Sequence, residues 1–329
     1  MLFKPKYKPK NPYFSSGPCA KRPGWKVEVL NNAVLGRSHR SRVALDKIRE
    51  VIKLTKEILE IPEDYQVGVV PASDTGAIEM LLWSLLGERA VDVLAWESFG
   101  KDWVKDIVDQ LQLKNTKVHL ADYGDIVNLS CLNFDNDIVF TWNGTTSGVC
   151  VPNGEWIKDE RLGLTICDAT SAAFSMDLPW SKLDATTFSW QKVLGGEAQH
   201  GVIIMSPRAI KRLENYSPNW PIPKIFQLTN NGKVNNKLYS GNTINTPSML
   251  CFEDVLDSLQ WIKSIGGLKK TIDISKENLK VVEEKLKDSS WLEFLANTSE
   301  NKSSTSICLK IKRTITDSLD KNKIEENLK

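Results

Sequence analysis

The sequence predicts an α/β protein built around a mostly parallel β-sheet with helices on both faces. The first observation is that short apolar runs alternate with helical segments along most of the chain, as in proteins made of strand–helix–strand units. The second is that seven of these runs have the length and composition of strands. They are residues 65–70, 91–96, 117–120, 138–142, 164–168, 184–190 and 201–205. The third is the length of 329 residues, which allows a large core and favours two domains.

Helices are predicted from apolar periodicity and from start signals. Residues 43–59 carry an apolar stripe that includes Ile48 and Ile52 and runs between charged faces. Ser206 and Pro207 start another helix, because proline is favoured in the first helical turn. The predicted helices are 43–59, a segment ending at 86, 99–113, 207–216, 252–265, 268–286 and a last helix from 320.

The pattern of predicted elements changes near residue 251, where long amphipathic helices replace the alternation of strands and helices. We therefore expect a large domain at residues 1–250, which begins with a loose, lysine-rich arm, and a smaller α+β domain at residues 251–329. Within the smaller domain, residues 306–311 form the one predicted strand. A single strand makes a poor sheet, so we expect this domain to be incomplete.

Charge and composition argue against several functional classes. The chain has 43 basic and 41 acidic residues and a formal net charge of +2, which argues against a nucleic acid or a membrane surface as the main partner. Its six cysteines form no CxxC pairs and lie mostly in apolar runs, as reduced thiols of cytosolic proteins do. Three histidines are too few to favour a histidine-built metal site. We find no signal peptide and no stretch long enough to span a bilayer, and expect a cytoplasmic protein.

A single lysine stands at the end of an apolar strand. Lys192 follows the run 184–190, and Gly195 and Gly196 follow Lys192. A buried lysine must be paired or neutral, and a neutral amine forms a Schiff base with an aldehyde. The glycines permit a tight turn close to a flat ligand. The alternative is a lysine whose stem lies along apolar surface while its amine reaches water.

A second polar residue ends another apolar strand. Asp168 follows the run 164–167, and ligands of open α/β sheets bind outside the carboxyl ends of strands. Pyridoxal 5'-phosphate (PLP) needs a lysine for its aldehyde and a carboxylate that keeps its ring nitrogen protonated. Lys192 and Asp168 supply that pair, and therefore predict a PLP site. Taken alone, Asp168 could equally cap a helix that starts at Ala169.

The segment after the first strand has the pattern of a phosphate cup. Residues 71–77 contain small and polar side chains between strand 65–70 and an apolar helix. At such a junction, free backbone N–H groups and the helix dipole attract an anion. An ordinary capped helix is the alternative interpretation.

Six short motifs occur in order along nearly the whole chain. They are Phe14-Ser15-Ser16-Gly17-Pro18, Ser38-His39-Arg40-Ser41, Asn143-Gly144-Thr145-Thr146-Ser147-Gly148, the Asp168 strand, Ser189-Trp190-Gln191-Lys192 and Asn245-Thr246-Pro247-Ser248. Each motif is weak alone, but the ordered set resembles the class V, fold-type I, PLP-dependent aminotransferases, and among them the phosphoserine aminotransferase family. The resemblance implies a large PLP-binding domain with a mostly parallel seven-stranded sheet, followed by a smaller C-terminal domain.

The resemblance also implies an activity. It is the transfer of an amino group from L-glutamate to 3-phosphohydroxypyruvate, giving O-phospho-L-serine and 2-oxoglutarate in serine biosynthesis. The 4-phosphohydroxythreonine reaction of pyridoxine biosynthesis is a related possibility. Other class V aminotransferases, of the serine- or alanine–glyoxylate type, and a non-catalytic protein that holds PLP are the alternatives. A nicotinamide dehydrogenase is disfavoured, because no GxGxxG motif follows a strand.

Roles for individual residues follow from the resemblance. Lys192 binds the cofactor aldehyde and then moves a proton, and Asp168 pairs with the ring nitrogen. Thr145 lies near the phenolic oxygen. Phe99 stacks on the ring, with Trp96 and Trp103 as alternatives. The phosphate is held by Ser73, Asp74, Thr75 and Gln191, and by Asn245 and Thr246 of the partner subunit, so that a homodimer shares its active sites. Substrate contacts are implied for Ser16, His39 and Arg40.

Two departures from the family pattern concern the substrate. The phosphate loop reads Ala72-Ser73-Asp74-Thr75, whereas many relatives have a glycine-rich loop with an arginine that meets the substrate phosphate. The arginine that binds the substrate carboxylate belongs to a C-terminal motif that this sequence does not contain. The residues therefore predict the cofactor site more fully than the substrate site.

Overall fold

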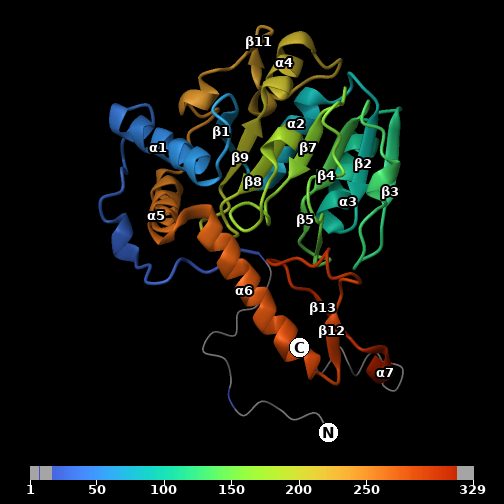
Figure 1. The fold of residues 1–329 in the computed structure, drawn as a ribbon. Helices are drawn as coiled ribbons and strands as arrows, with labels where there is room; N and C mark the ends of the chain where they lie inside the picture. The colour runs from blue at the N-terminus through green and yellow to red at the C-terminus, as the bar shows by residue number, and fades with distance from the viewer. Residues whose placement is uncertain (1–6, 8–16, 317–329) are drawn as a thin grey trace.

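A seven-stranded mixed sheet forms the centre of the molecule (Figure 1). The computed structural model describes residue 7 and residues 17–316. The strands of the sheet are β1 (Gln66–Pro71), β2 (Val91–Ala95), β3 (Thr116–Leu120), β4 (Asp137–Thr141), β7 (Thr165–Asp168), β8 (Ala185–Ser189) and β9 (His200–Met205). Their order is β1-β9-β8-β7-β4-β2-β3. β9 runs antiparallel to β1 and β8, and the other neighbours are parallel. The predicted mostly parallel, seven-stranded sheet is confirmed.

Helices cover both faces of this sheet, because its buried strands present apolar side chains alternately to each side. The helices are α1 (Arg42–Ile58), α2 (Ser73–Leu85), α3 (Ser98–Lys105), α4 (Pro207–Asn215) and α5 (Met249–Ile265). On β9, Val202 and Ile204 belong to the core under α1 and α5, and Ile203 and Met205 to the core under α2 and α4. A π-helical turn, Asp106–Gln110, extends α3.

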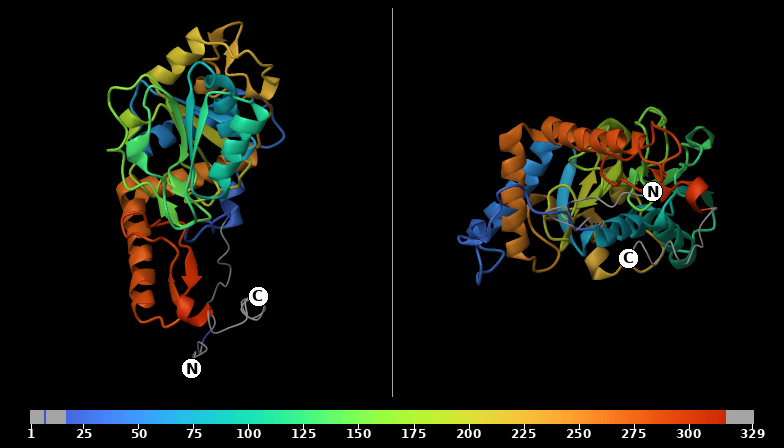
Figure 2. Two further views of the ribbon diagram at one scale, coloured as in Figure 1. Left: turned by 90° about the vertical axis from the view of Figure 1, so that its right-hand side faces the viewer. Right: turned by 90° about the horizontal axis from the view of Figure 1, so that it is seen from below.

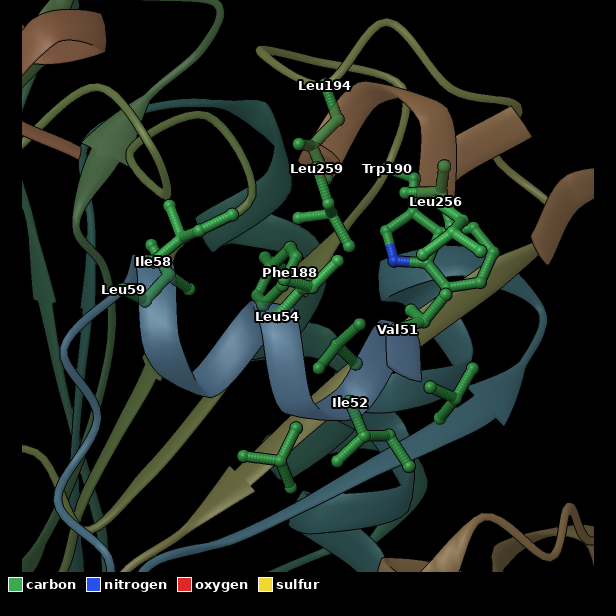
Figure 3. Packing of buried hydrophobic residues seen from close by; sticks show 14 of the residues in the cluster. Val51, Ile52, Leu54, Ile58, Leu59, Phe188, Trp190, Leu194, Leu256 and Leu259 are labelled. Carbon is green, nitrogen blue, oxygen red and sulfur yellow. The ribbon is translucent and has the colours of Figure 1, made fainter. Parts of the chain in front are cut away.

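The stripe predicted on the first helix is the buried face of α1. Ser41 caps the helix, and its hydroxyl accepts a hydrogen bond from the N–H of Ala44. Figure 3 shows Val51, Ile52, Leu54 and Ile58 of α1 packed toward Phe188 of β8 and toward side chains of α5. The core between α1, α5 and the sheet therefore joins segments from both ends of the chain.

The last part of the described chain projects from the sheet (Figure 2). It consists of α6 (Gly267–Lys287), β12 (Leu292–Phe294), β13 (Leu309–Ile311) and α7 (Arg313–Thr316). The predicted strand at 306–311 contains β13, which pairs antiparallel with β12. β12 is three residues long and has too little pattern to be predicted. The helix predicted from residue 320 lies outside the described residues.

The junction between α5 and α6 lies at two glycines. Gly266 has a φ of 119° and Gly267 a φ of 69°, a left-handed geometry that favours glycine. α5 packs in the core of the sheet, whereas α6 leads away from it. The division at residues 250 and 251 stays a prediction, and we propose that Gly266 is the physical boundary between the two units.

The segment 229–241 carries a small hairpin. β10 (Thr229–Asn230) pairs with β11 (Lys233–Val234), and Leu228 and Leu238 at its ends are buried in the core. The remaining short elements are β5 (Asn143–Gly144), β6 (Val149–Cys150) and 3-10 turns at Val27–Leu30, Leu129–Cys131, Trp180–Lys182, Lys224–Phe226 and Leu238–Ser240. Across the described ranges, no helix is both long and apolar enough to cross a membrane.

Candidate active site

The predicted cofactor residues meet at one edge of the sheet. Parallel strands end at the same edge, so the segments after β1, β7 and β8 come together there. A cavity of about 80 Å³ lies among them. Its walls include every residue predicted to hold the cofactor within one subunit, namely Ser73, Asp74, Thr75, Phe99, Thr145, Asp168, Gln191 and Lys192. The structure thus places them around one space, while their individual roles stay predictions.

Asp168 is held in one orientation by two N–H groups. One carboxylate oxygen accepts a hydrogen bond from the backbone N–H of Thr170 at 2.9 Å, and the other accepts from Nε1–H of Trp103 at 3.2 Å. The bond from Thr170 resembles the cap considered from the sequence, but turns rather than a helix follow Asp168. The side chain is 8% exposed and lines the cavity. Both donors fix the position of this carboxylate at the edge of the cavity.

Lys192 lies where two cavities meet. It lines the cavity beside Asp168 and a larger one of about 410 Å³, and Thr145 lines both. The backbone carbonyl oxygen of the neighbouring residue Gln191 accepts a hydrogen bond from the backbone N–H of Cys19 at 2.7 Å. Gly195, with a φ of 60°, lies against the backbone of Ala20, whose oxygen would be 2.4 Å from an added Cβ. The close approach that requires this glycine is therefore to the N-terminal segment of the same chain.

The loop before α2 has the geometry of an anion site. Ala72 and Ser73 both have left-handed backbone conformations, with φ of 67° and 53°. Among the described residues, no side chain caps the first turn of α2. The backbone of β9 passes close by at Gly201, where an added Cβ would come within 2.2 Å of the Ser73 oxygen. The absence of a cap favours the phosphate cup over the ordinary capped helix.

The residues around the cavity fit PLP. Several buried polar atoms here have no hydrogen bond within the described ranges: Oγ1 of Thr170, Oδ1 of Asn143 and Oε1 of Gln191. Such atoms are rare in folded proteins, and a polar ligand in the cavity would satisfy them. A lysine amine, an oriented carboxylate and an uncapped helix N-terminus together match an aldehyde, a ring nitrogen and a phosphate.

The three aromatic candidates have different environments. Phe99 is 43% exposed and lines the cavity. Trp96 is fully buried in a core cluster. Trp103 is buried and directs its indole N–H at Asp168. Phe99 and Trp103 both line the cavity, and Phe99 is the more exposed of the two, which supports its predicted stacking role.

Most of the predicted substrate residues lie elsewhere in a single chain. His39 and Arg40 line a separate cavity of about 420 Å³, together with residues of the segment 224–244. Asn245 and Thr246 are exposed. Ser16 lies outside the described residues. Among the described residues, the two cavities that Lys192 lines therefore contain none of the contacts that were attributed to substrate or to a second subunit.

Glu97 is a site residue that the sequence analysis missed. It is fully buried and lines the cavity, and its two oxygens accept hydrogen bonds from the N–H of Gly100 at 2.6 Å and from the hydroxyl of Thr146 at 3.0 Å. Burial raises its pKa. Its position directly after an apolar strand is the same signal that identified Asp168.

A hydroxyl-rich segment near the end of the described chain was also missed. Thr305 donates a hydrogen bond to the backbone oxygen of Ser171 at 2.7 Å, and Asn143 donates to the hydroxyl groups of Thr305 and Ser306 at 3.3 Å. These residues line the larger cavity, apart from Asn143. The run Ser303-Ser304-Thr305-Ser306 before the predicted strand was its sequence signal. In the described part of the chain, no group of three or more His, Cys, Asp or Glu residues could hold a metal ion.

Comparison with known proteins agrees with the fold. No model of a protein family matches the chain. The phosphoserine aminotransferase of Methanosarcina mazei is 57% identical over 326 residues, which cover 99% of this chain and 86% of that protein. The solved phosphoserine aminotransferase of Bacillus circulans subsp. alkalophilus has a TM-score of 0.74 and 19% identity, over 93% of this chain and 84% of that chain. The PLP-bound phosphoserine aminotransferase of Trichomonas vaginalis has a TM-score of 0.70 and 20% identity, over 88% of this chain and 81% of that chain. The structural likenesses confirm the fold class, and the identity to the M. mazei protein shows that this chain belongs to the phosphoserine aminotransferase family.

Proposed function

We propose that this protein is a PLP-dependent phosphoserine aminotransferase. It transfers the amino group of L-glutamate to 3-phosphohydroxypyruvate and forms O-phospho-L-serine and 2-oxoglutarate, a step of serine biosynthesis. The relative that is 57% identical carries this name, and the fold neighbour from T. vaginalis is described as PLP-bound. The observation that carries the proposal is that Lys192 and Asp168, from the ends of neighbouring strands, line one cavity with the N-terminus of α2.

Each side chain has a defined task in this proposal. Bound PLP supplies an electron sink that stabilises the negative charge left when a proton leaves the substrate carbon. Lys192 holds the cofactor and then carries that proton on its Nζ atom. Asp168, oriented by Trp103 and Thr170, keeps a proton on the ring nitrogen. Ser73 and Thr75, at the start of α2, hold the phosphate.

The experiment that tests the activity compares amino acceptors. Purified protein with PLP is given L-glutamate and either 3-phosphohydroxypyruvate or glyoxylate, and 2-oxoglutarate formation is measured. We expect kcat/KM for 3-phosphohydroxypyruvate to be at least about a hundredfold higher, because a site built for a polar group discriminates strongly against an analogue that lacks it. A preference for glyoxylate would instead favour the alternative class V activity. 4-Phosphohydroxythreonine with 2-oxoglutarate tests the pyridoxine reaction, and here glutamate formation is measured.

We also propose a cytoplasmic homodimer with shared active sites. Asn245 and Thr246 are exposed and do not line the cavity beside Lys192, which supports a contribution across a two-fold axis. His39 and Arg40 also lie away from that cavity. All six cysteines are free thiols, which supports a reducing compartment.

Mixing two inactive variants tests the shared sites. Lys192→Ala and the double variant Asn245→Ala/Thr246→Ala should each be nearly inactive. After subunit exchange, each hybrid dimer would contain one site with Lys192 from one subunit and Asn245 and Thr246 from the other. We expect recovery of at most about half the parental activity per hybrid, because the second site carries both defects. If subunits exchange and no activity returns, the partner roles of Asn245 and Thr246 are wrong.

A further inference from the structure

Two buried aspartates line the wall of the same small cavity. Asp74 is in the first turn of α2 and is 6% exposed, and Asp168 ends β7 and is 8% exposed. Both line the cavity. The oxygens of Asp168 accept hydrogen bonds from two N–H groups, whereas within residues 17–316 neither oxygen of Asp74 has a hydrogen bond of good geometry. The two carboxyl groups therefore line one cavity, but only the carboxyl group of Asp168 accepts hydrogen bonds from N–H groups.

The charges around the cavity raise the free energy of a state in which both aspartates are ionised. Three carboxyl groups line it, those of Asp74, Glu97 and Asp168, and Lys192 is the one cation among the lining residues. Glu97 and Asp168 accept N–H hydrogen bonds that stabilise a carboxylate. Among the described residues, no N–H group donates to Asp74; the hydroxyl groups of Thr187 and Thr170 favour its ionised form, but burial and the charge of Asp168 raise its pKa. When two buried carboxyl groups are adjacent, one of them keeps its proton.

The groups that face Asp74 come from several elements. They are Asp168 and the Cys167 thiol of β7, the hydroxyl groups of Thr170 and Thr187, and across the cavity Glu97 and Lys192. Burial, followed by the charge of Asp168, holds the pKa of Asp74 well above its usual range. Because Asp168 accepts the two N–H groups, the proton of the pair belongs on Asp74 and the negative charge on Asp168.

We infer that Asp74 is a positioning residue, which remains protonated at neutral pH and donates a hydrogen bond from its carboxyl O–H to Asp168. The pair then carries one negative charge, on Asp168, the residue that would pair with the ring nitrogen of bound PLP. This inference rests on the proposed function, and it assigns the Asp74 side chain a task other than binding phosphate. Ser73 and the exposed Thr75 remain the residues of this loop whose side chains can reach a phosphate.

Infrared difference spectroscopy detects the proposed proton directly. The purified full chain, with and without PLP, is compared with Asp74→Asn at neutral pH. A protonated carboxyl group has a C=O stretch that carboxylates lack, so we expect one such band in the parent and its loss in the variant. Asp254→Asn is the matched control, because Asp254 is also buried but is ion-paired with Lys21 at 2.5 Å. It should keep the band. If Asp74→Asn does not remove the band, the inference is wrong.

The pH dependence of unfolding gives a second readout. Between the ordinary aspartate pKa of about 4 and its raised value in the folded protein, Asp74 holds a proton that the unfolded chain releases. The parent therefore loses stability as the pH rises through this window. Asp74→Asn has no such proton, so its stability relative to the parent should increase with pH. Parallel curves would contradict the inference.

Two further outcomes separate the test of the protonated carboxyl group from folding of the variant and from the proposed activity. If Asp74→Asn does not fold, Asp74→Ser replaces it, since serine is also uncharged and smaller, and the same loss of the band is expected. If the protein transfers no amino group but the band is present and is lost in the variant, the proposed function fails and the protonated carboxyl pair stands.

Discussion

Replacing Lys192 with alanine is expected to abolish transamination, with a rate loss of at least about a thousandfold, or about 4 kcal/mol of transition-state stabilisation. The physical reason is that Lys192 is the one amine among the residues that line the cavity with Asp168. Without it, no group there can bond the cofactor aldehyde and then move the proton. The visible absorption of a lysine-bound cofactor should disappear together with the activity.

The lysine can be identified independently of the rate. Borohydride reduction of the parent protein, followed by peptide mapping, should place the cofactor label on Lys192. Lys53→Ala is a suitable control, because Lys53 is 71% exposed on α1, and this variant should keep both label and activity. A label on any other lysine would show that the assignment of Lys192 is wrong.

Asp168→Asn should retain some bound cofactor but lower turnover by several orders of magnitude. An amide cannot stabilise a cation on the ring nitrogen, so the electron sink is lost while the shape of the cavity is kept. The measurement is kcat at saturating cofactor, with cofactor occupancy determined separately. The exposed Asp177→Asn variant is the control and should behave as the parent does. A loss of less than about tenfold, or about 1.4 kcal/mol, would refute this role for Asp168.

Several features of the site were accessible from local patterns. Asp168 and Lys192 each follow an apolar run. Burying a charged side chain at such a position raises the free energy of the folded state unless a partner or ligand compensates for it. The segment 71–77 between a strand and a helix likewise has a local signature of small and polar residues. The same rule, applied to Glu97 after the run 91–96, would have identified a further cavity residue.

The different environments of the three aromatic candidates become visible only in the three-dimensional packing. Phe99, Trp96 and Trp103 lie close together in the sequence, and all are of a type that is often buried. Their exposure separates them: Trp96 is fully buried, Trp103 is 4% exposed and Phe99 is 43% exposed. Periodicity over so few residues does not distinguish a ring in the core from one that faces a cavity.

The sequence by itself determined the fold class, most of the strands and helices, and the residues at the ends of the strands that form the site. These features depend on local composition and periodicity, which short segments contain. The tertiary structure alone decided that Asp74 lies beside Asp168, that α5 packs with α1 in one core, and that β12 pairs with β13. Those outcomes depend on contacts between segments far apart in the chain, and burial and like-charge proximity, which decide where a proton resides, arise only when such segments meet.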